Sequence, residues 1–171
     1  MSNVFDEGNL HFDFNNCGTA ERFDVNKTNP YGMKAVDFFV ETADCLYFIE
    51  IKDYQHPNAT QERQKKDFSM LISAAKEKES LFVIEMGTKI KDSLLRKYAE
   101  KHSFSKKVMY LLVINLDTLG EFERGKLKEK MNGYVPTGLN DKRFTAFKKI
   151  EFDLINADKL QKYGVSCTSI A

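Results

Sequence analysis

The sequence predicts an α/β fold in which helices flank a mixed central β-sheet. Three observations support this: two paired apolar runs within 35–52, apolar residues at helical spacing between 58 and 102, and a continuous apolar run at 107–117. A continuous run of this kind is typical of a strand that is covered on both faces. With 171 residues, 42% of them hydrophobic, the chain is expected to form a single domain over 1–171.

Short strands are expected in the first part of the chain. Leu10–Phe14 and Glu21–Val25 fit such strands, with a turn between them. Residues 26–32 are rich in turn formers and predict a loop. The two opening strands of the main sheet are expected at Ala35–Glu41 and Leu46–Lys52.

Two helices are expected next. Asn58 follows Pro57 and is a candidate N-cap for the first helix. The second helix is expected to end near His102, although its first residues, LFVIE, fit a strand equally well. The buried stripes of these helices are expected at Phe68, Leu71, Ile72 and Ala75, and at Val83, Met86, Ile90, Leu94 and Tyr98.

The last third of the chain completes the predicted sheet. Lys107–Asp117 is expected to be a central strand, and EFERGKLKEKM predicts a charged helix whose alternating lysines and glutamates indicate a solvated surface. In KKIEFDLI the apolar residues alternate with charged ones, as in a half-buried strand. ADKLQKYG predicts a short helix closed by Gly164, and VSCTSI predicts a last strand.

Composition excludes several classes of protein. The net charge is +1, so bulk charge does not indicate a polyanionic partner. Cys17, Cys45 and Cys167 are widely spaced and form no C-x-x-C pair, which favours a reduced, intracellular protein. The first ten residues lack the apolar core of a signal peptide, and the apolar run Val108–Ile114 is too short to span a bilayer. A cytoplasmic protein with no membrane partner is therefore expected.

Charged residues stand in the two opening strands, where a buried sheet disfavours them. If these strands form an antiparallel hairpin with a two-residue or a four-residue loop, facing residues have numbers that sum to 87. Asp37 then faces Glu50, with their Cβ atoms about 5 Å apart, and Lys52 emerges on the same face. A three-residue loop would break this match.

Opposed carboxylates in an apolar sheet either share a proton or bind a cation. Mg²⁺ prefers one or two carboxylates together with phosphate oxygens and water. Such an ion lowers the pKa of a bound water and screens the charge that develops at phosphorus, and Lys52 beside it could hold the attacking water. The pattern therefore predicts metal-assisted hydrolysis of a phosphodiester. Taken alone, however, the tetrapeptide IEIK is an ordinary amphipathic strand end.

At these residues the sequence resembles the PD-(D/E)XK nuclease superfamily. The match consists of "VD" at Val36-Asp37, twelve intervening residues, and "EIK" at 50–52, and this spacing is similar to that of Holliday junction resolvases and restriction-type members. The resemblance implies a restriction-endonuclease-like core. It implies Asp37, Glu50 and the backbone carbonyl of Ile51 as ligands of Mg²⁺, or of Mn²⁺ in its place. It also implies Lys52 as the catalytic residue that positions the water.

The chain departs from the superfamily pattern in two places. Val36 replaces the proline that gives the signature its name. The superfamily also often supplies a further acid from an upstream helix. Glu21 is the candidate for that acid here, with Glu7 as an alternative, although no helix is expected around either residue. Without the further acid, the resemblance implies one metal ion rather than two.

The resemblance implies a nucleic-acid substrate, with DNA favoured over RNA. Residues 89–107 hold seven bases and two acids, and the candidates for contact with a nucleic-acid backbone are Lys89, Lys91, Lys97 and Lys101. Their spacing also fits an ordinary solvated helix face. Many members of the superfamily dimerise to cut both strands, so a homodimer, or another protein partner, is a further expectation.

Two alternatives remain open. The chain could be a catalytically inactive nuclease-fold protein that acts as a binding, immunity or regulatory partner, which the acidic N-terminal stretch and the missing acid favour. It could also be a structural α/β domain in which Lys52 satisfies both acids as an ion pair, and apolar replacement of the charges would then be tolerated.

Overall fold

The computed structural model describes all residues except 1–2, 26–29, 31 and 171, so most of the loop expected at 26–32 lies outside the described residues. The described part contains eight strands, three α-helices and two 3₁₀-helices. In chain order these are β1 (Val4–Glu7), β2 (Leu10–Asp13), β3 (Thr19–Arg22), β4 (Phe38–Glu41), β5 (Cys45–Asp53), α1 (Gln61–Lys76), α2 (Leu81–Ala99), β6 (Lys107–Asn115), α3 (Glu121–Asn132), η1 (Thr137–Asn140), β7 (Lys149–Ile155), η2 (Ala157–Tyr163) and β8 (Ser166–Ser169).

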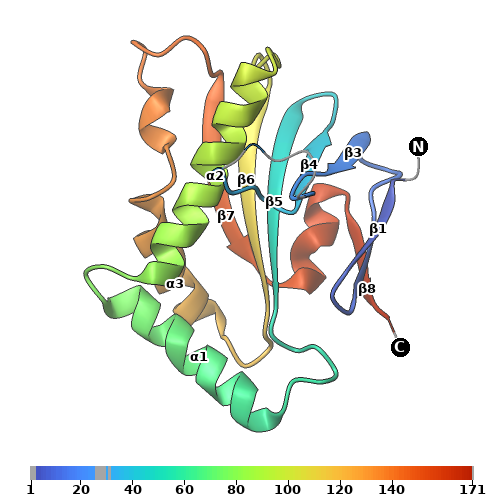
Figure 1. Ribbon diagram of the computed structural model, residues 1–171, viewed down its shortest axis with the longest axis vertical. Coiled ribbons are helices and arrows are strands. Elements are labelled where there is room, and N and C mark those ends of the chain that lie inside the picture. Colours follow the sequence, from blue (N-terminus) through green and yellow to red (C-terminus); the bar gives the residue numbers. More distant parts are fainter. Residues whose placement is uncertain (1–2, 26–29, 31, 171) are drawn as a thin grey trace.

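A mixed five-stranded sheet forms the centre of the described structure, with the strand order β3-β4-β5-β6-β7 (Figure 1). β4 pairs antiparallel with both β3 and β5, whereas β6 pairs parallel with both β5 and β7. Between β5 and β6 the chain passes through α1 and α2, as a parallel connection requires. The predicted α/β architecture with a mixed sheet is confirmed, and so is the central position of the strand that begins at Lys107.

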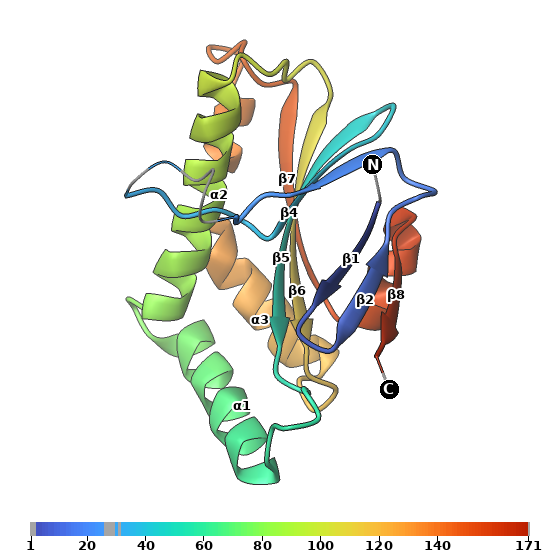
Figure 2. The same ribbon diagram turned by 45° about the vertical axis from the view of Figure 1, so that its right-hand side comes forward.

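The helices α1, α2 and α3 cover one face of the large sheet. A second sheet of three antiparallel strands, in the order β1-β2-β8, covers the opposite face (Figure 2). The expectation of a single sheet was wrong here, because β2 and β8 pair with each other and not with the large sheet. β1 was not expected at all. Alternation in a short strand identifies the face that it buries but not the strand with which it pairs, which is why the sequence did not separate the two sheets.

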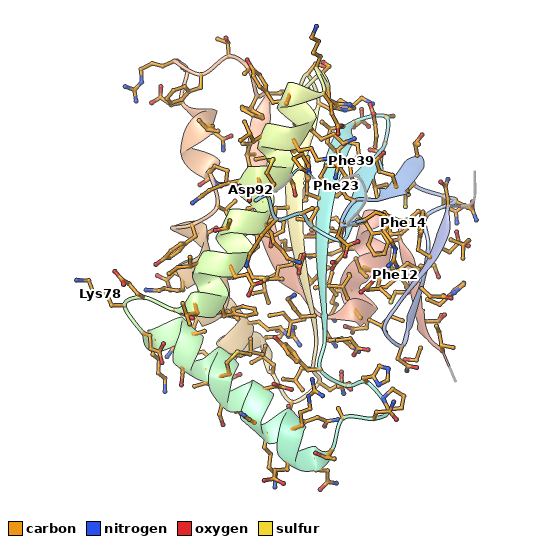
Figure 3. The ribbon with its side chains drawn as sticks, in the orientation of Figure 1. Phe12, Phe14, Phe23, Phe39, Lys78 and Asp92 are labelled. Atoms are coloured by element: carbon orange, nitrogen blue, oxygen red, sulfur yellow. The ribbon has the colours of Figure 1, made fainter. Side chains whose placement is uncertain are left out.

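The large sheet has an apolar core on each face, as expected for a sheet between two layers. Along β6 the buried side chains alternate: Val108, Tyr110, Leu112 and Ile114 face the helices, and Met109, Leu111 and Val113 face the small sheet. Figure 3 shows Phe23 and Phe39 on the side of α2, and Phe12 and Phe14 near the small sheet. This alternation also fixes which face the side chains of β5 occupy.

Two details of the helices differ from expectation, and the open alternative at LFVIE is settled in favour of a helix. α1 begins at Gln61 rather than after Asn58, because the Thr60 hydroxyl accepts a hydrogen bond from the Arg63 N–H at 3.2 Å and so caps the helix. LFVIE is helical and opens α2. Tyr98, expected to be buried, lies in the last turn of α2 and is 56% exposed, whereas the preceding Lys97 packs against the core residues Phe23 and Phe39.

α3 is the larger correction. It buries Arg124, Leu127 and Met131, so the interpretation of this helix as solvated surface was wrong for one of its stripes. The other predicted elements of the C-terminal part are confirmed, including the burial of Ile150, Phe152 and Leu154 in β7 and the left-handed Gly164 after η2. Within the described residues, none of the helices combines the length and the apolar composition that crossing a bilayer demands.

Candidate active site

The register of the β4–β5 hairpin matches the prediction. Phe38 faces Ile49 and Glu41 faces Leu46, so the numbers of facing residues sum to 87. The turn is the two-residue alternative, since the Thr42 N–H donates to the Cys45 carbonyl at 2.9 Å. Asp37 lies one residue before β4, and this register places it opposite Glu50.

The candidate residues share the face of the sheet that α2 covers. Phe48 belongs to the core on the helix side, and side chains two residues apart along a strand point the same way. Glu50 and Lys52 therefore project toward α2. Asp37 does so too, because Phe39, two residues later in the adjoining strand, lies in the same core.

The polar contacts join four side chains. Lys52 Nζ lies 2.7 Å from Glu50 Oε1, and Lys89 Nζ, which comes from α2, lies 2.7 Å from the same oxygen. Lys89 Nζ is also 3.9 Å from Asp37 Oδ1. The Ile51 N–H donates to Asp37 Oδ2 at 2.6 Å. Ile51 thus contacts the site through its amide, and the structure brings Asp37, Glu50 and Lys52 together.

Burial makes this cluster electrostatically unusual. Glu50 is 0% exposed and Asp37 is 5% exposed. Burial, followed by the charge of Glu50, raises the pKa of Asp37 to about 7, although Lys89 and the Ile51 amide act in the opposite direction. Burial alone would lower the pKa of Lys52, but the adjacent Glu50 carboxylate outweighs it and raises that pKa. Asp37 therefore exchanges its proton near neutral pH.

Replacement of Asp37 by Asn should change how stability depends on pH. The folded pKa of Asp37, about 7, exceeds the value of about 3.9 for an unfolded aspartate. Between these values the folded protein holds a proton that the unfolded chain releases, so the stability of the wild type falls as the pH rises through this range. Asp37→Asn removes this loss and should gain about 1–3 kcal/mol relative to the wild type between pH 5 and pH 8.

Urea unfolding in the presence of a chelator measures this gain. Asp44→Asn in the exposed hairpin turn is the matched control, and its stability relative to the wild type should not change with pH. If the stability difference between Asp37→Asn and the wild type were constant from pH 5 to pH 8, the assignment of a protonated Asp37 would be refuted.

Of the two candidates for a further acid, Glu21 lies away from the pair. Its carboxylate accepts a hydrogen bond from Lys97 Nζ at 2.6 Å. Glu7 pairs with Arg22 at 2.9 Å. Burial, chiefly, raises the pKa of Glu7, and the charge of Glu50 contributes in the same direction. Glu7 rather than Glu21 is therefore the acid that is electrostatically coupled to the candidate site.

The lysines expected to contact nucleic acid occupy different environments. Lys89 lies in the site itself. Lys97 is buried against Phe39 and pairs with Glu21 and Glu100. Lys91 and Lys101 show no ion pair within the described part of the chain. Acids thus neutralise much of the basic segment, a feature that its sequence did not reveal.

Lys89 is the residue of the site that sequence reasoning missed in this role. The sequence predicts only a nucleic-acid contact for Lys89, because helical spacing does not state which side of α2 faces the sheet. A signal existed in retrospect: Lys89 precedes the buried Ile90 and lies three residues after the buried Met86, so it borders the apolar stripe.

No protein-family model matches the chain, and no curated protein or solved structure is significantly similar to it. The assignment of the candidate site therefore rests on the geometry of its residues.

The residues of the site fit a hard divalent cation. Glu50 Oε2 is buried and has no hydrogen-bond partner among the described residues, and an orphaned carboxylate oxygen is the kind of donor that Mg²⁺ or Mn²⁺ accepts. No group of three or more His, Cys, Asp or Glu side chains that could hold a metal is found in the described structure. The side-chain donors here are consequently the carboxylates of Asp37 and Glu50.

Proposed function

We propose that this chain is a nuclease of the PD-(D/E)XK type, with a restriction-endonuclease-like core, that hydrolyses phosphodiester bonds of DNA in preference to RNA. The observation that carries the proposal is the shared face of Asp37, Glu50 and Lys52, which the hairpin register and the 2.7 Å contact between Glu50 and Lys52 define. The antiparallel hairpin beside the parallel strands β5 and β6 supports the same core.

Each residue has a distinct part in this proposal. Asp37 and Glu50 would hold Mg²⁺ or Mn²⁺, with the Ile51 carbonyl as a further oxygen donor. When bound, the ion supplies a water of lowered pKa and offsets negative charge at phosphorus. The Lys52 side chain is 27% exposed, so its ammonium can reach a water molecule or a phosphate oxygen at the edge of the site and orient it for attack.

Removal of divalent ions tests the proposal. Supercoiled plasmid, linear duplex, single-stranded DNA and RNA are incubated with the purified protein, first with EDTA and then with excess Mg²⁺ or Mn²⁺. Cleavage should be absent with the chelator and restored by either ion. Glu50→Gln, which keeps the size of the side chain but removes its charge, should abolish it, and Glu21→Gln should not. Cleavage by Glu50→Gln at the wild-type rate would place the activity elsewhere.

A second candidate function is that of a binding or regulatory protein that keeps the fold without the chemistry. The observation in its favour is that Glu50 already pairs with two lysines, so the carboxylates have counter-charges without any metal. Thermal unfolding separates the two candidates. A nuclease should be stabilised by Mg²⁺ in a manner that depends on Asp37 and Glu50, whereas a binding protein should show no such stabilisation.

A further inference from the structure

Lys89 occupies the position between the two carboxylates that a bound cation would take. Its Nζ lies 2.7 Å from Glu50 Oε1 and 3.9 Å from Asp37 Oδ1, and its side chain is 16% exposed. Lys52 shares the same Glu50 oxygen, while Oε2 of that carboxylate has no hydrogen-bond partner among the described residues. One oxygen of Glu50 thus bears both ammonium groups.

A divalent ion and the Lys89 ammonium cannot occupy this position together. Two cations held at about 4 Å in a partly buried site repel each other strongly, and only the lysine can move away. Its charge sits at the end of a flexible four-carbon stem. Among the described residues Oε2 has no partner and Oε1 has two, so the two lysines satisfy Glu50 incompletely. A competing cation can therefore make an interaction with Oε2 that the lysines do not make.

Glu85 offers Lys89 an alternative partner. The two residues are four apart on α2, the spacing at which glutamate followed by lysine forms an ion pair on a helix. Glu85 now pairs with Lys34 at 3.1 Å, and its side chain is 46% exposed. A hydrogen bond from Lys34, chiefly, lowers the pKa of Glu85, and the charges of Lys52 and Lys89 also contribute. The carboxylate is therefore ionised and within the electrostatic reach of Lys89.

We propose that Lys89 is a displaceable counter-ion of the Asp37–Glu50 pair: it neutralises the pair without metal and swings toward Glu85 when a divalent ion binds. This inference rests on the proposed function, because it concerns the metal loading of that same site. Lys89 keeps the buried carboxylates paired while the site is unloaded. Lys89 also sets a minimum strength for metal binding, since an ion binds only if its attraction to both carboxylates exceeds that of the ammonium.

Lysine reactivity in the wild-type protein tests this displacement without measuring cleavage. The protein is labelled briefly with an amine-acylating reagent, with EDTA or with Mg²⁺, and each lysine is quantified by mass spectrometry. Labelling of Lys89 should accelerate about tenfold with Mg²⁺, because its ammonium leaves the buried Glu50 carboxylate for the more exposed surroundings of Glu85. Lys91 is exposed and Lys97 is buried against Glu21 on the same helix, and neither should change. An unchanged Lys89 rate under saturating Mg²⁺ would refute the displacement.

Lys89→Met provides a second, independent test. Methionine keeps most of the apolar stem, and Lys52 remains to pair with Glu50. Calorimetric titration should show Mg²⁺ and Mn²⁺ binding at least about tenfold tighter than in the wild type, since a competing charge has been removed. Lys91→Met, two residues away on the exposed side, should bind the ions as the wild type does.

The outcomes separate the two proposals. If the wild type binds Mg²⁺ through Asp37 and Glu50 but Lys89→Met binds it equally or more weakly, the counter-ion inference fails and the nuclease proposal stands. If neither the wild type nor Lys89→Met binds Mg²⁺ or Mn²⁺, both proposals fail.

Discussion

Replacement of Lys52 by methionine is expected to lower the rate of phosphodiester cleavage about a thousandfold, measured under single-turnover conditions with saturating Mg²⁺. A side chain that positions or deprotonates an attacking water contributes about 10²–10⁴ in rate. Lys52 is placed for that task because it projects on the same face as Asp37 and Glu50 yet remains 27% exposed. Methionine keeps the length of the side chain and removes its ammonium, the group that would bind the water.

The loss of activity should not come from unfolding. In Lys52→Met the buried Glu50 carboxylate keeps Lys89 as a partner at 2.7 Å, so the free energy of unfolding should fall by less than about 1 kcal/mol. Lys126→Met, which replaces an exposed lysine of α3 outside the site, is the matched control and should retain full activity. A Lys52→Met protein that keeps more than a tenth of the wild-type rate would remove Lys52 from the mechanism.

The pairing of residues in the hairpin was predictable from the sequence because it depends only on the period of a strand and the length of the loop. Side chains alternate with a period of two, and a hairpin loop of known length fixes which residues face each other. The position of Asp37 opposite Glu50 follows from these two facts and from the length of the turn. The position of Lys52 on the same face follows from the same period of two, but no contact from outside the hairpin does.

Lys89 illustrates what local counting omits. Its contact with Glu50 joins residues 39 positions apart and depends on how α2 is rotated about its axis over the sheet. Packing of Met86 and Ile90 against the core sets this rotation. The sequence shows an amphipathic helix but not which strand the edge of its apolar stripe will meet. The pairing of β2 with β8 was missed for a similar reason, since partner choice between distant strands is a tertiary property.

Arg124 is the clearest case of a residue that the sequence concealed. In a helix of alternating lysines and glutamates it looked like one more solvated charge, yet it is only 9% exposed. Its guanidinium donates to the carbonyls of Ile114, Leu119 and Leu116 at 2.9, 2.9 and 2.8 Å, and to Asn156 Oδ1 at 3.3 Å. These carbonyls belong to the end of β6 and to the turn after it. Arg124, which belongs to α3, thus donates hydrogen bonds to the backbone carbonyls at the C-terminal end of the central strand β6.

Arg124→Met is therefore expected to lower the free energy of unfolding by about 3–5 kcal/mol, measured by urea denaturation. Methionine fills the space of the side chain but leaves the Leu119 carbonyl without a donor, and an unsatisfied buried group costs about 1–3 kcal/mol. The carbonyls of Ile114 and Leu116 keep a backbone N–H donor but each loses a hydrogen bond to a charged group, which contributes about 1.5–3 kcal/mol. Arg124→Lys should recover only part of the loss, because an ammonium cannot reproduce the planar fork. Lys126→Met on the exposed side of α3 should cost less than about 1 kcal/mol. If Arg124→Met were as stable as Lys126→Met, water must satisfy those carbonyls equally well, and Arg124 would not be what holds the end of β6 in place.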